Sequence, residues 1–354
     1  MFVKNCWYCA GWDYELSQGR CALLARRLAG EAVVLYRKLD GTVVAFEDRC
    51  CHRQAPLSRG TKEGDSLRCG YHGMKYGPDG VCTEIPGQTI IPPKARVRTY
   101  PVVEQDNWIW VWLGDPALAD PKHICSAVGP GAQGWNIKTS KVSINTNYRR
   151  EIENLMDLSH VAWIHRDTLG GSMAWVEAKL NHTPIERGIN TEFWMPEAAA
   201  PGFAKHLFPP EAVFDAHANI NFTLPCNFIM RYQVWSPGTM KVGKENGLLL
   251  LDSWSSQAVT PRDEHWCDYY YSWGLSEATD SPGMVDLLVE AANAAFLEDK
   301  AMLEAQYERL RECPDGNKID IKADTGPNKM LFLVDKLLAE EAAVTAPRQQ
   351  SARG

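Results

Sequence analysis

Hydrophobic residues in the first third of the chain occur in short runs that are rich in β-branched and aromatic side chains. Residues 31–48 (EAVVLYRKLDGTVVAFED) contain two such runs, which meet at Asp40-Gly41. This dipeptide supplies the positive φ angles of a hairpin turn. Residues 96–105 and 108–116 form a second pair of runs, which meets at Asp106-Asn107. The pattern predicts a small antiparallel β domain over residues 1–118.

A change of composition separates this region from the rest of the chain. Residues 117–134 are rich in Pro, Gly and Ala, which is typical of a linker, and we expect a second domain over residues 119–343. Its first residues, 135–148, are strand-like, and residues 149–165 then show helical periodicity. Residues 175–273 contain β-branched and aromatic runs broken by Pro and Gly, which predicts a mainly antiparallel sheet.

The strongest helical pattern covers residues 283–312, directly after Pro282. Its apolar residues recur at helical spacing, at Met284, Leu288, Ala291, Ala295 and Met302. The polar residues 344–354 are expected to form a disordered tail. Strands followed by one long helix make the predicted fold class α+β.

Composition narrows the class of protein. The 354 residues are 45% hydrophobic and 23% charged, and the net charge of −7 argues against a general nucleic-acid binder. The apolar runs are shorter than the ~18 residues that a membrane helix needs, and the start lacks a signal-peptide pattern, so we expect a cytoplasmic protein. The eleven cysteines are an odd number, and several of them are scattered without a pairing pattern, which favours reduced thiols. Cys6 and Cys9 form C-x-x-C, but the aromatic residues around them favour a strand over a redox pair.

Two Cys/His pairs stand out in residues 50–72. Cys50 and His52 are separated by one residue, Cys69 and His72 by two, and sixteen residues lie between the pairs. Two thiolates and two imidazoles can hold zinc, or a [2Fe–2S] cluster in which the histidines bind one iron. The flanking turn residues favour the cluster, and four unrelated core residues are the remaining alternative.

A second group of possible metal ligands lies in residues 154–165, NLMDLSHVAWIH. On an α-helix, Asp157 and His160 share a face, whereas His160 and His165 are about 140° apart. A shared metal therefore requires the helix to end or distort between the two histidines. Two histidines also need a carboxylate to form the facial triad that leaves open positions on ferrous iron. A satisfied core histidine is the alternative for each.

Asp299 is the candidate carboxylate. Its neighbours at three and four residues' distance include Ala295, Phe296 and Leu303, so it lies on the face of the long helix that should be buried. An isolated buried carboxylate is costly, and a metal ion removes that cost. The alternatives are a buried Asp paired with an Arg, or a helix whose buried face differs from the predicted one. Glu298, beside it, is the weaker candidate.

The motif N-L-M-D-x-x-H-x4-H, downstream of C-x-H-x16-C-x2-H and followed by Glu-Asp on the last long helix, resembles the oxygenase component of Rieske non-haem iron oxygenases. NCWYCAGW and PVVEQDNWIWVWLGDP are similar to the branch of vanillate O-demethylase, toluenesulfonate methyl-monooxygenase and dicamba O-demethylase. The resemblance extends to about residue 170 and returns around Asp299. Cys9 departs from it, since these relatives usually carry an aliphatic residue there.

The resemblance implies a Rieske β domain followed by a helix-grip catalytic domain. It implies that Asp157 bridges an iron ligand to a cluster histidine of the next subunit in a head-to-tail homotrimer. It also implies the ligands of the two cofactors: the [2Fe–2S] cluster on Cys50, His52, Cys69 and His72, and mononuclear Fe(II) on His160, His165 and Asp299.

The hypothesis for function is a monooxygenase that acts on an aromatic substrate. Electrons from NAD(P)H would arrive through a separate flavin and iron–sulfur reductase, because the chain has no G-x-G-x-x-G dinucleotide motif. Oxidation of an O- or N-alkyl group would release an aldehyde. Hydroxylation of an aryl methyl group or of the ring is the alternative, and a non-catalytic electron carrier or ligand-binding protein is a second one.

Polar residues in the predicted strands are weak candidates for substrate contacts: Arg231, Asn219, His217 and Gln257. An inward Arg would suit a carboxylate or sulfonate. The sequence does not reveal which side chains point inward.

Overall fold

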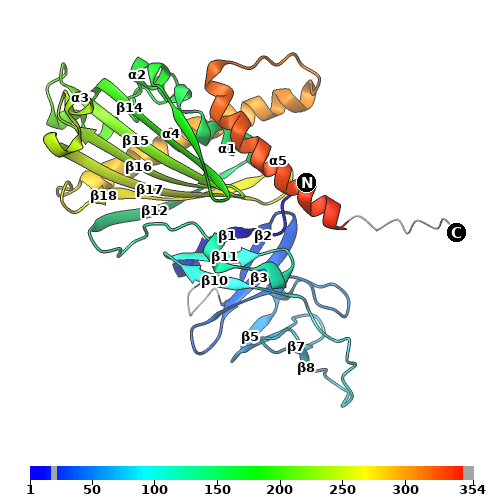
Figure 1. The fold of residues 1–354 in the computed structure, drawn as a ribbon. Coiled ribbons are helices and arrows are strands. Elements are labelled where there is room, and N and C mark those ends of the chain that lie inside the picture. The colour runs from blue at the N-terminus through cyan, green and yellow to red at the C-terminus, as the bar shows by residue number, and fades with distance from the viewer. Residues whose placement is uncertain (17–21, 346–354) are drawn as a thin grey trace.

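The computed structural model describes residues 1–16 and 22–345. A small β part lies below a large sheet that carries the long helices (Figure 1). Among the described residues, no helix combines the length and apolar character needed to cross a membrane. The predicted α+β class, with a β domain before a sheet-and-helix domain, is confirmed. The division into residues 1–118 and 119–343 stays a prediction.

The N-terminal part contains three small antiparallel sheets. One sheet has the order β1-β11-β10, another β2-β3-β4-β9 and the third β5-β6-β7-β8. The strands of the first are β1 (Trp7–Trp12), β10 (Val102–Gln105) and β11 (Trp108–Trp112). Those of the second are β2 (Leu24–Leu28), β3 (Glu31–Arg37), β4 (Val43–Glu47) and β9 (Thr99–Tyr100). Those of the third are β5 (Thr61–Glu63), β6 (Ser66–Arg68), β7 (Lys75–Tyr76) and β8 (Cys82–Glu84).

Both predicted hairpins form. Strands β3 and β4 pair antiparallel around Gly41, whose φ is 90°. Strands β10 and β11 pair around Asp106 and Asn107, at φ angles of 56° and 65°. Glycine adopts this left-handed region freely, and aspartate and asparagine tolerate it better than most residues, which explains why the two dipeptides were readable as turns.

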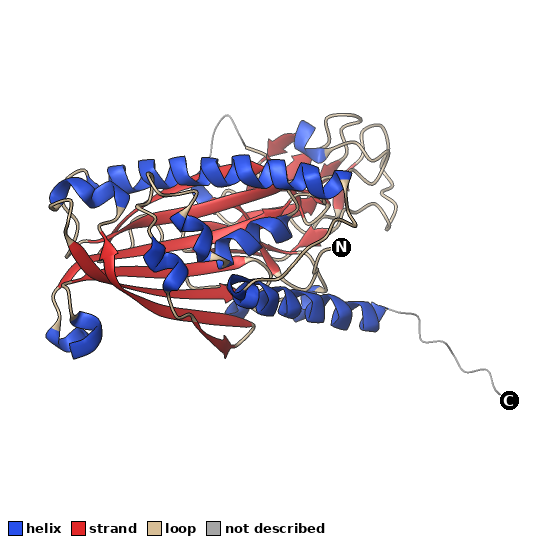
Figure 2. Ribbon diagram, turned by 90° about the horizontal axis from the view of Figure 1, so that it is seen from above, coloured by secondary structure: helices blue, strands red, loops and turns tan. Residues whose placement is uncertain are grey.

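The C-terminal part is a seven-stranded antiparallel sheet with the order β12-β18-β17-β16-β15-β14-β13. The long helix α4 (Met284–Glu312) lies across one face of this sheet (Figure 2). The strands are β12 (Trp135–Ile144), β13 (Asn181–Ile185), β14 (Gly188–Ala199), β15 (Val213–Thr223), β16 (Asn227–Trp235), β17 (Leu249–Pro261) and β18 (Cys267–Ser276). The other helices are α1 (Tyr148–Met156), α2 (Met173–Glu177), α3 (Thr239–Val242) and α5 (Thr325–Thr345).

The buried face of α4 includes Met284, Leu288 and Ala295 as predicted, but Met302 lies outside it. Met302 is 54% exposed, while Leu303 is buried. The reason lies in Phe296, whose ring packs 4.9 Å from Tyr269 and 4.6 Å from Tyr271, between centroids, and so fixes which face meets β18. Asp299 remains inside this face, with 3% exposure.

Helix α5 was missed by the sequence analysis. It runs to Thr345, so the predicted tail does not begin at residue 344. The rest of that tail, residues 346–354, lies outside the described residues.

A layer of tryptophans joins the two parts of the molecule. Five buried indoles of β1 and β11 belong to one hydrophobic cluster with Ala258 and Tyr270 of the large sheet. Thr260 Oγ1 donates a hydrogen bond of 2.7 Å to the carbonyl of Cys9. The N-terminal part therefore covers one face of β17 and β18, and α4 packs against β12 and β18 on the other face. The five indoles are those of Trp7, Trp12, Trp108, Trp110 and Trp112.

Candidate metal centres

Two loops of matching geometry carry the Cys/His pairs. In the first, the amide of Cys50 donates to the carbonyl of Ala55, and the amide of Gln54 donates to Cys50. In the second, Cys69 donates to Met74, and Gly73 donates to Cys69. The fifth residue of each loop has a positive φ, 58° at Gln54 and 75° at Gly73, so both loops close in the same way.

The four candidate ligands come together at the tips of these loops. Cys50 and Cys69 are each 2% exposed, whereas His52 and His72 are exposed and their rings lie 4.6 Å apart, between centroids. Burial first, and then the hydrogen bond to Cys50, raise the pKa of Cys69. Metal binding would replace the thiol protons. Two buried thiols and two exposed imidazoles, with one of each on either loop, match the donor set that a Rieske cluster requires.

The second site is built where α1 ends. Asn147 caps the start of this helix, and Asp157 is both its last cap and the first cap of the 3₁₀ helix η5 (Leu158–Ala162). The prediction that Asp157 and His160 share an α-helical face is therefore wrong. The carboxylate of Asp157 accepts from the amide and hydroxyl of Ser159 instead, and His160 Nδ1 bonds to the backbone carbonyl of Asp157.

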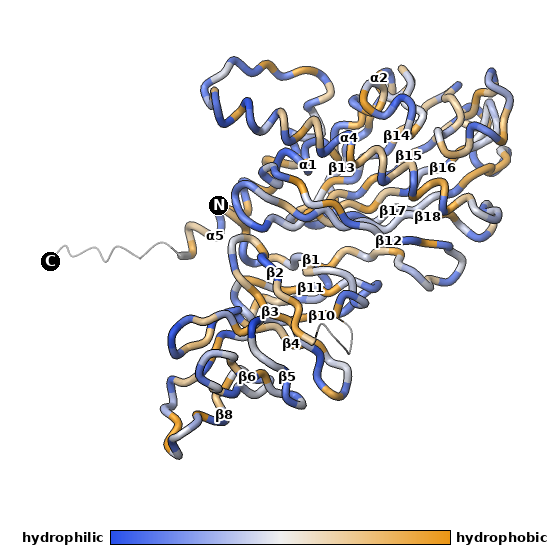
Figure 3. Tube along the Cα trace, turned by 180° about the vertical axis from the view of Figure 1, so that it is seen from behind, coloured by the Kyte–Doolittle hydropathy of each residue, from blue (hydrophilic) through white to orange (hydrophobic). Residues whose placement is uncertain are grey.

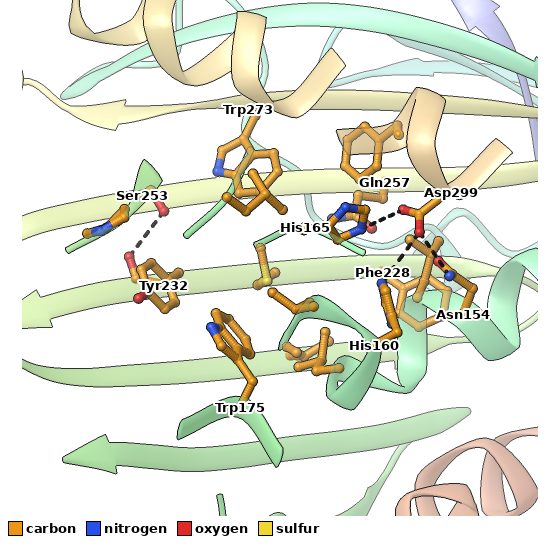
Figure 4. Close-up of a pocket in the computed structure, with 18 of the residues that line it drawn as sticks. Asn154, His160, His165, Trp175, Phe228, Tyr232, Ser253, Gln257, Trp273 and Asp299 are labelled. Carbon is orange, nitrogen blue, oxygen red and sulfur yellow. Dashed lines mark hydrogen bonds and ion pairs between the residues drawn. The ribbon is translucent and has the colours of Figure 1, made fainter. Parts of the chain in front are cut away.

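The end of the helix brings both histidines to Asp299. Candidate ligand atoms of His160, His165 and Asp299 all lie within 4.8 Å of one another. His160 Nε2 is 3.5 Å from Asp299 Oδ1, and His165 Nε2 is 3.1 Å from Asp299 Oδ2 (Figure 4). His165 and Asp299 are buried, with 1% and 3% of their surfaces exposed.

The outer nitrogen of each ring has an acceptor of its own. His165 Nδ1 is 2.8 Å from the carboxylate of Glu298, which also accepts from the Thr168 hydroxyl at 2.8 Å. Because carbonyl and carboxylate oxygens accept, the Nδ1 atoms of His160 and His165 carry the protons, and their Nε2 lone pairs face Asp299. Acceptors that face one another need a proton or a cation between them. The residues thus fit a metal ion.

Glu298 and Thr168 are the functional side chains that sequence reasoning missed in this role. Glu298 was considered only as a second-choice ligand, and its adjacency to Asp299 was the available signal. Nothing in the sequence pattern singles out Thr168. Asn154, in contrast, lay in the quoted motif, and its amide donates to Asp299 Oδ1 at 3.1 Å.

Burial and charge set the protonation of the pocket. Burial lowers the pKa of His160, and the nearby Asp299 opposes this only in part. Burial also lowers the pKa of His165, but the hydrogen bonds and charges of Asp299 and Glu298 outweigh it, so the net shift is upward. Deeper in the core, burial and then the charge of Asp299 raise the pKa of Glu151 well above its ordinary range.

A mostly apolar pocket opens next to His160, His165 and Asp299. In Figure 4 the metal-site residues lie at one end of the side chains drawn, and Tyr232 and Ser253 lie at the other. The aromatic rings of its wall are those of Trp175, Phe203, Phe228, Tyr232, Trp273 and Phe296.

Only one of the four candidate substrate residues, Gln257, lines this pocket. Arg231, Asn219 and His217 line a separate depression. Side chains alternate between the faces of a strand, and β16 presents Phe228, Met230 and Tyr232 to the pocket, which turns Arg231 away from it. The interpretation of Arg231, Asn219 and His217 as residues of the metal-site pocket is therefore wrong.

Two family models match the chain. The Rieske [2Fe-2S] domain matches residues 6–101, and the vanillate O-demethylase oxygenase C-terminal domain matches residues 144–340.

Relatives match along nearly the whole chain. The toluene-4-sulfonate monooxygenase system iron-sulfur subunit of Comamonas testosteroni is 35% identical over 98% of this chain and 100% of its own. The oxygenase component of dicamba O-demethylase from Stenotrophomonas maltophilia is 31% identical, over 97% and 99%. The crystal structure of dicamba monooxygenase bound to dicamba has a TM-score of 0.85 at 30% identity, and covers 97% of this chain and 99% of that one.

Proposed function

Because this chain belongs to the Rieske non-haem iron oxygenases, we propose that it dealkylates an aromatic substrate at an O- or N-alkyl group. It is the oxygenase component of a monooxygenase whose cofactors are a Rieske [2Fe–2S] cluster and a mononuclear iron. This family membership excludes the two alternative interpretations, a non-catalytic electron carrier and a protein that binds only zinc. The observation that carries the proposal is the group of His160, His165 and Asp299 at one end of an aromatic pocket.

We assign the cluster to Cys50, His52, Cys69 and His72, and the mononuclear iron to His160, His165 and Asp299. When bound, the cluster supplies single electrons and the ferrous iron supplies open positions for O₂. The matched loops and the inward Nε2 atoms support this assignment. Thr168 and Glu298 hold the ring of His165, and the carbonyl of Asp157 holds that of His160.

The pocket then has two tasks of its own. Its aromatic walls hold a ring and exclude water, so that an alkyl group of the substrate lies at the end formed by His160 and Asp299. In dealkylation, one atom of O₂ enters a C–H bond next to oxygen or nitrogen. The other atom takes up two electrons and two protons and leaves as water. The product then breaks its C–O or C–N bond and gives an aldehyde and a free hydroxyl or amine.

Electron delivery between subunits is part of the proposal. The sheet β5-β6-β7-β8, beside the cluster loops, lies at the far end of the molecule from α4 (Figures 1 and 3). A head-to-tail homotrimer would bring these loops to the metal site of a neighbour. Asp157 would be the bridge. It is half-buried, and both of the hydrogen bonds that its carboxylate accepts from Ser159 go to the same oxygen, Oδ1.

A reductase must supply the electrons. The relative from Comamonas testosteroni is named as one subunit of a monooxygenase system, which supports a separate partner for this chain. We propose a flavin and iron–sulfur reductase that uses NAD(P)H. A cytoplasmic location stays a prediction.

Turnover with a panel of substrates tests the function. The oxygenase with such a reductase is given methoxy-, methyl- and N-alkyl aromatics, and O₂ uptake and aldehyde release are measured. Dealkylation predicts aldehyde in step with O₂ consumption. A hydroxymethyl product without aldehyde would instead support aryl-methyl hydroxylation, a second candidate favoured by the relative named for toluene-4-sulfonate.

A further inference from the structure

We propose that the substrate is an uncharged aromatic with a single ring, whose polar substituent is hydrogen-bonded by Tyr232 at the end of the pocket away from His160. This inference rests on the proposed oxygenase function and narrows its substrate class. It sets this chain apart from a relative whose named substrate, toluene-4-sulfonate, is an anion.

The first observation is the charge of the wall. The ionisable metal-site groups of the lining are His160, His165 and Asp299, and no lysine or arginine accompanies them among the described residues that line the pocket. A carboxylate or sulfonate would enter this space without a cationic side chain to pair with. Burying an unpaired anion costs far more than burying a neutral polar group, so the wall selects against it.

Two cationic side chains, one on β16 and one in the connection between β16 and β17, lie on the opposite face of the sheet and already have partners. Arg231 lies on the opposite face and holds Asp252 through two bonds of 2.9 and 2.6 Å. Lys244 lies on that face too, 3.1 Å from His217 Nδ1 and 3.2 Å from Gln233 Oε1. Reaching the pocket would require either side chain to pass through the sheet.

Away from the metal site, the polar groups that face the pocket are neutral. Ser253 Oγ donates to the carbonyl of Tyr232 at 3.1 Å, and Gln257 Nε2 donates to Ser255 at 2.9 Å. The hydroxyl of Tyr232 makes no hydrogen bond to the residues that the structure describes, although its ring stacks on Trp175 with centroids 5.8 Å apart. Trp273 Nε1, on the same wall, is a buried donor that also lacks a described partner. A neutral acceptor such as an amide carbonyl satisfies the tyrosine hydroxyl.

The size of the pocket limits the substrate. The cavity has a volume of about 90 Å³. Pockets for drug-sized ligands have volumes of ~300–1,000 Å³, so this one takes only a small ligand. That is room for one substituted ring between Trp175 and Trp273.

Equilibrium binding tests the inference without turnover. Isothermal titration calorimetry on the metal-loaded oxygenase, without reductase, compares two pairs of near-identical shape: 4-methoxybenzamide with 4-methoxybenzoate, and toluene-4-sulfonamide with toluene-4-sulfonate. The neutral member should bind at least ~10-fold more tightly in each pair. An anion that binds as tightly as its partner, or the failure of both pairs to bind, overturns the proposal.

Variants locate the recognition. Tyr232→Phe should lower the affinity for 4-methoxybenzamide by about 5- to 10-fold. It should leave unchanged the affinity for 4-methoxytoluene, which has no polar substituent besides the methoxy group. The control Arg231→Met, on the opposite face, should change the affinity for neither ligand. Loss of benzoate binding in Arg231→Met would place anion recognition at Arg231 and overturn the proposal, as would an unchanged amide affinity in Tyr232→Phe.

The outcomes separate this inference from the proposed function. A neutral ligand that binds tightly but releases no aldehyde with reductase contradicts dealkylation and leaves the substrate class standing. An anion that binds tightly and releases aldehyde contradicts the substrate class and leaves dealkylation standing.

Discussion

The imidazole of His165 lies between two carboxylates of consecutive residues, with Nδ1 2.8 Å from Glu298 and Nε2 3.1 Å from Asp299. On a helix, adjacent residues point about 100° apart, so a ring can reach both only if it lies across the helix surface. The first carboxylate fixes the ring and its tautomer. The second shares a metal site with it.

Glu298→Gln should therefore weaken iron binding while the fold and the cluster remain. A neutral amide holds the Nδ1 proton less strongly, and loss of such a supporting group typically costs ~10–100-fold in metal affinity. Iron retained after dialysis against a graded chelator measures this. Glu308→Gln, on the exposed part of α4, is the control. Equal iron retention in both variants would show that Glu298 does not support the site.

His160→Ala should lose the mononuclear iron and keep the visible absorption of the Rieske cluster. The two sites use separate residues, so only one donor set is damaged. Iron analysis should find the two iron ions of the cluster but not the mononuclear iron. Turnover by a variant that lacks this imidazole would contradict the assignment of the site.

Asp157→Asn should keep both metal centres loaded and slow turnover by roughly 10–100-fold, as expected when a group next to a metal ligand is changed. The asparagine can still accept from Ser159, so the cap of η5 is preserved. Rapid mixing of reduced protein with O₂ and substrate follows the reoxidation of the cluster. Reoxidation at the wild-type rate would exclude Asp157 from the electron path.

Glu151→Gln should make stability less dependent on pH. Burial raises the pKa of Glu151 above 4.5, its ordinary value, so the folded state holds a proton that the unfolded state releases. The stability that this proton contributes is complete below pH 4.5 and falls as pH rises, by up to ~1.4 kcal/mol per pH unit until the folded pKa is reached. The variant should thus gain stability relative to wild type between pH 5 and 8.

Urea-unfolding midpoints over this pH range measure the effect, with Glu308→Gln as the control. Parallel pH profiles of Glu151→Gln and wild type would mean that Glu151 does not hold its proton in the folded state.

Gly171→Ala should displace η5 and disturb the iron site. A Cβ at this position would lie 1.8 Å from the carbonyl oxygen of Val161, one residue after His160. Backbone cannot yield cheaply at that distance, so His160 should move. We expect reduced iron content with an unchanged cluster spectrum. A fully iron-loaded variant would show that η5 adapts without moving its ligand.

The sequence by itself determined the chemistry and the local elements. Residue type decides which atoms can bind iron. The spacing of Cys50, His52, Cys69 and His72 along the chain does not depend on how the chain packs. The hairpin at Asp40-Gly41 and the helix over α4 depend on local backbone preferences, which act within a few residues.

Only the tertiary structure decided which side chains face the pocket. Arg231 and Tyr232 are neighbours in sequence, and the packing of β16 makes one an outer residue and the other a pocket residue. The same packing left Met302 of α4 exposed and brought Glu298 to His165. Strand alternation has a period of two, so the sequence gives two equal choices of face, and only contacts between distant segments select one.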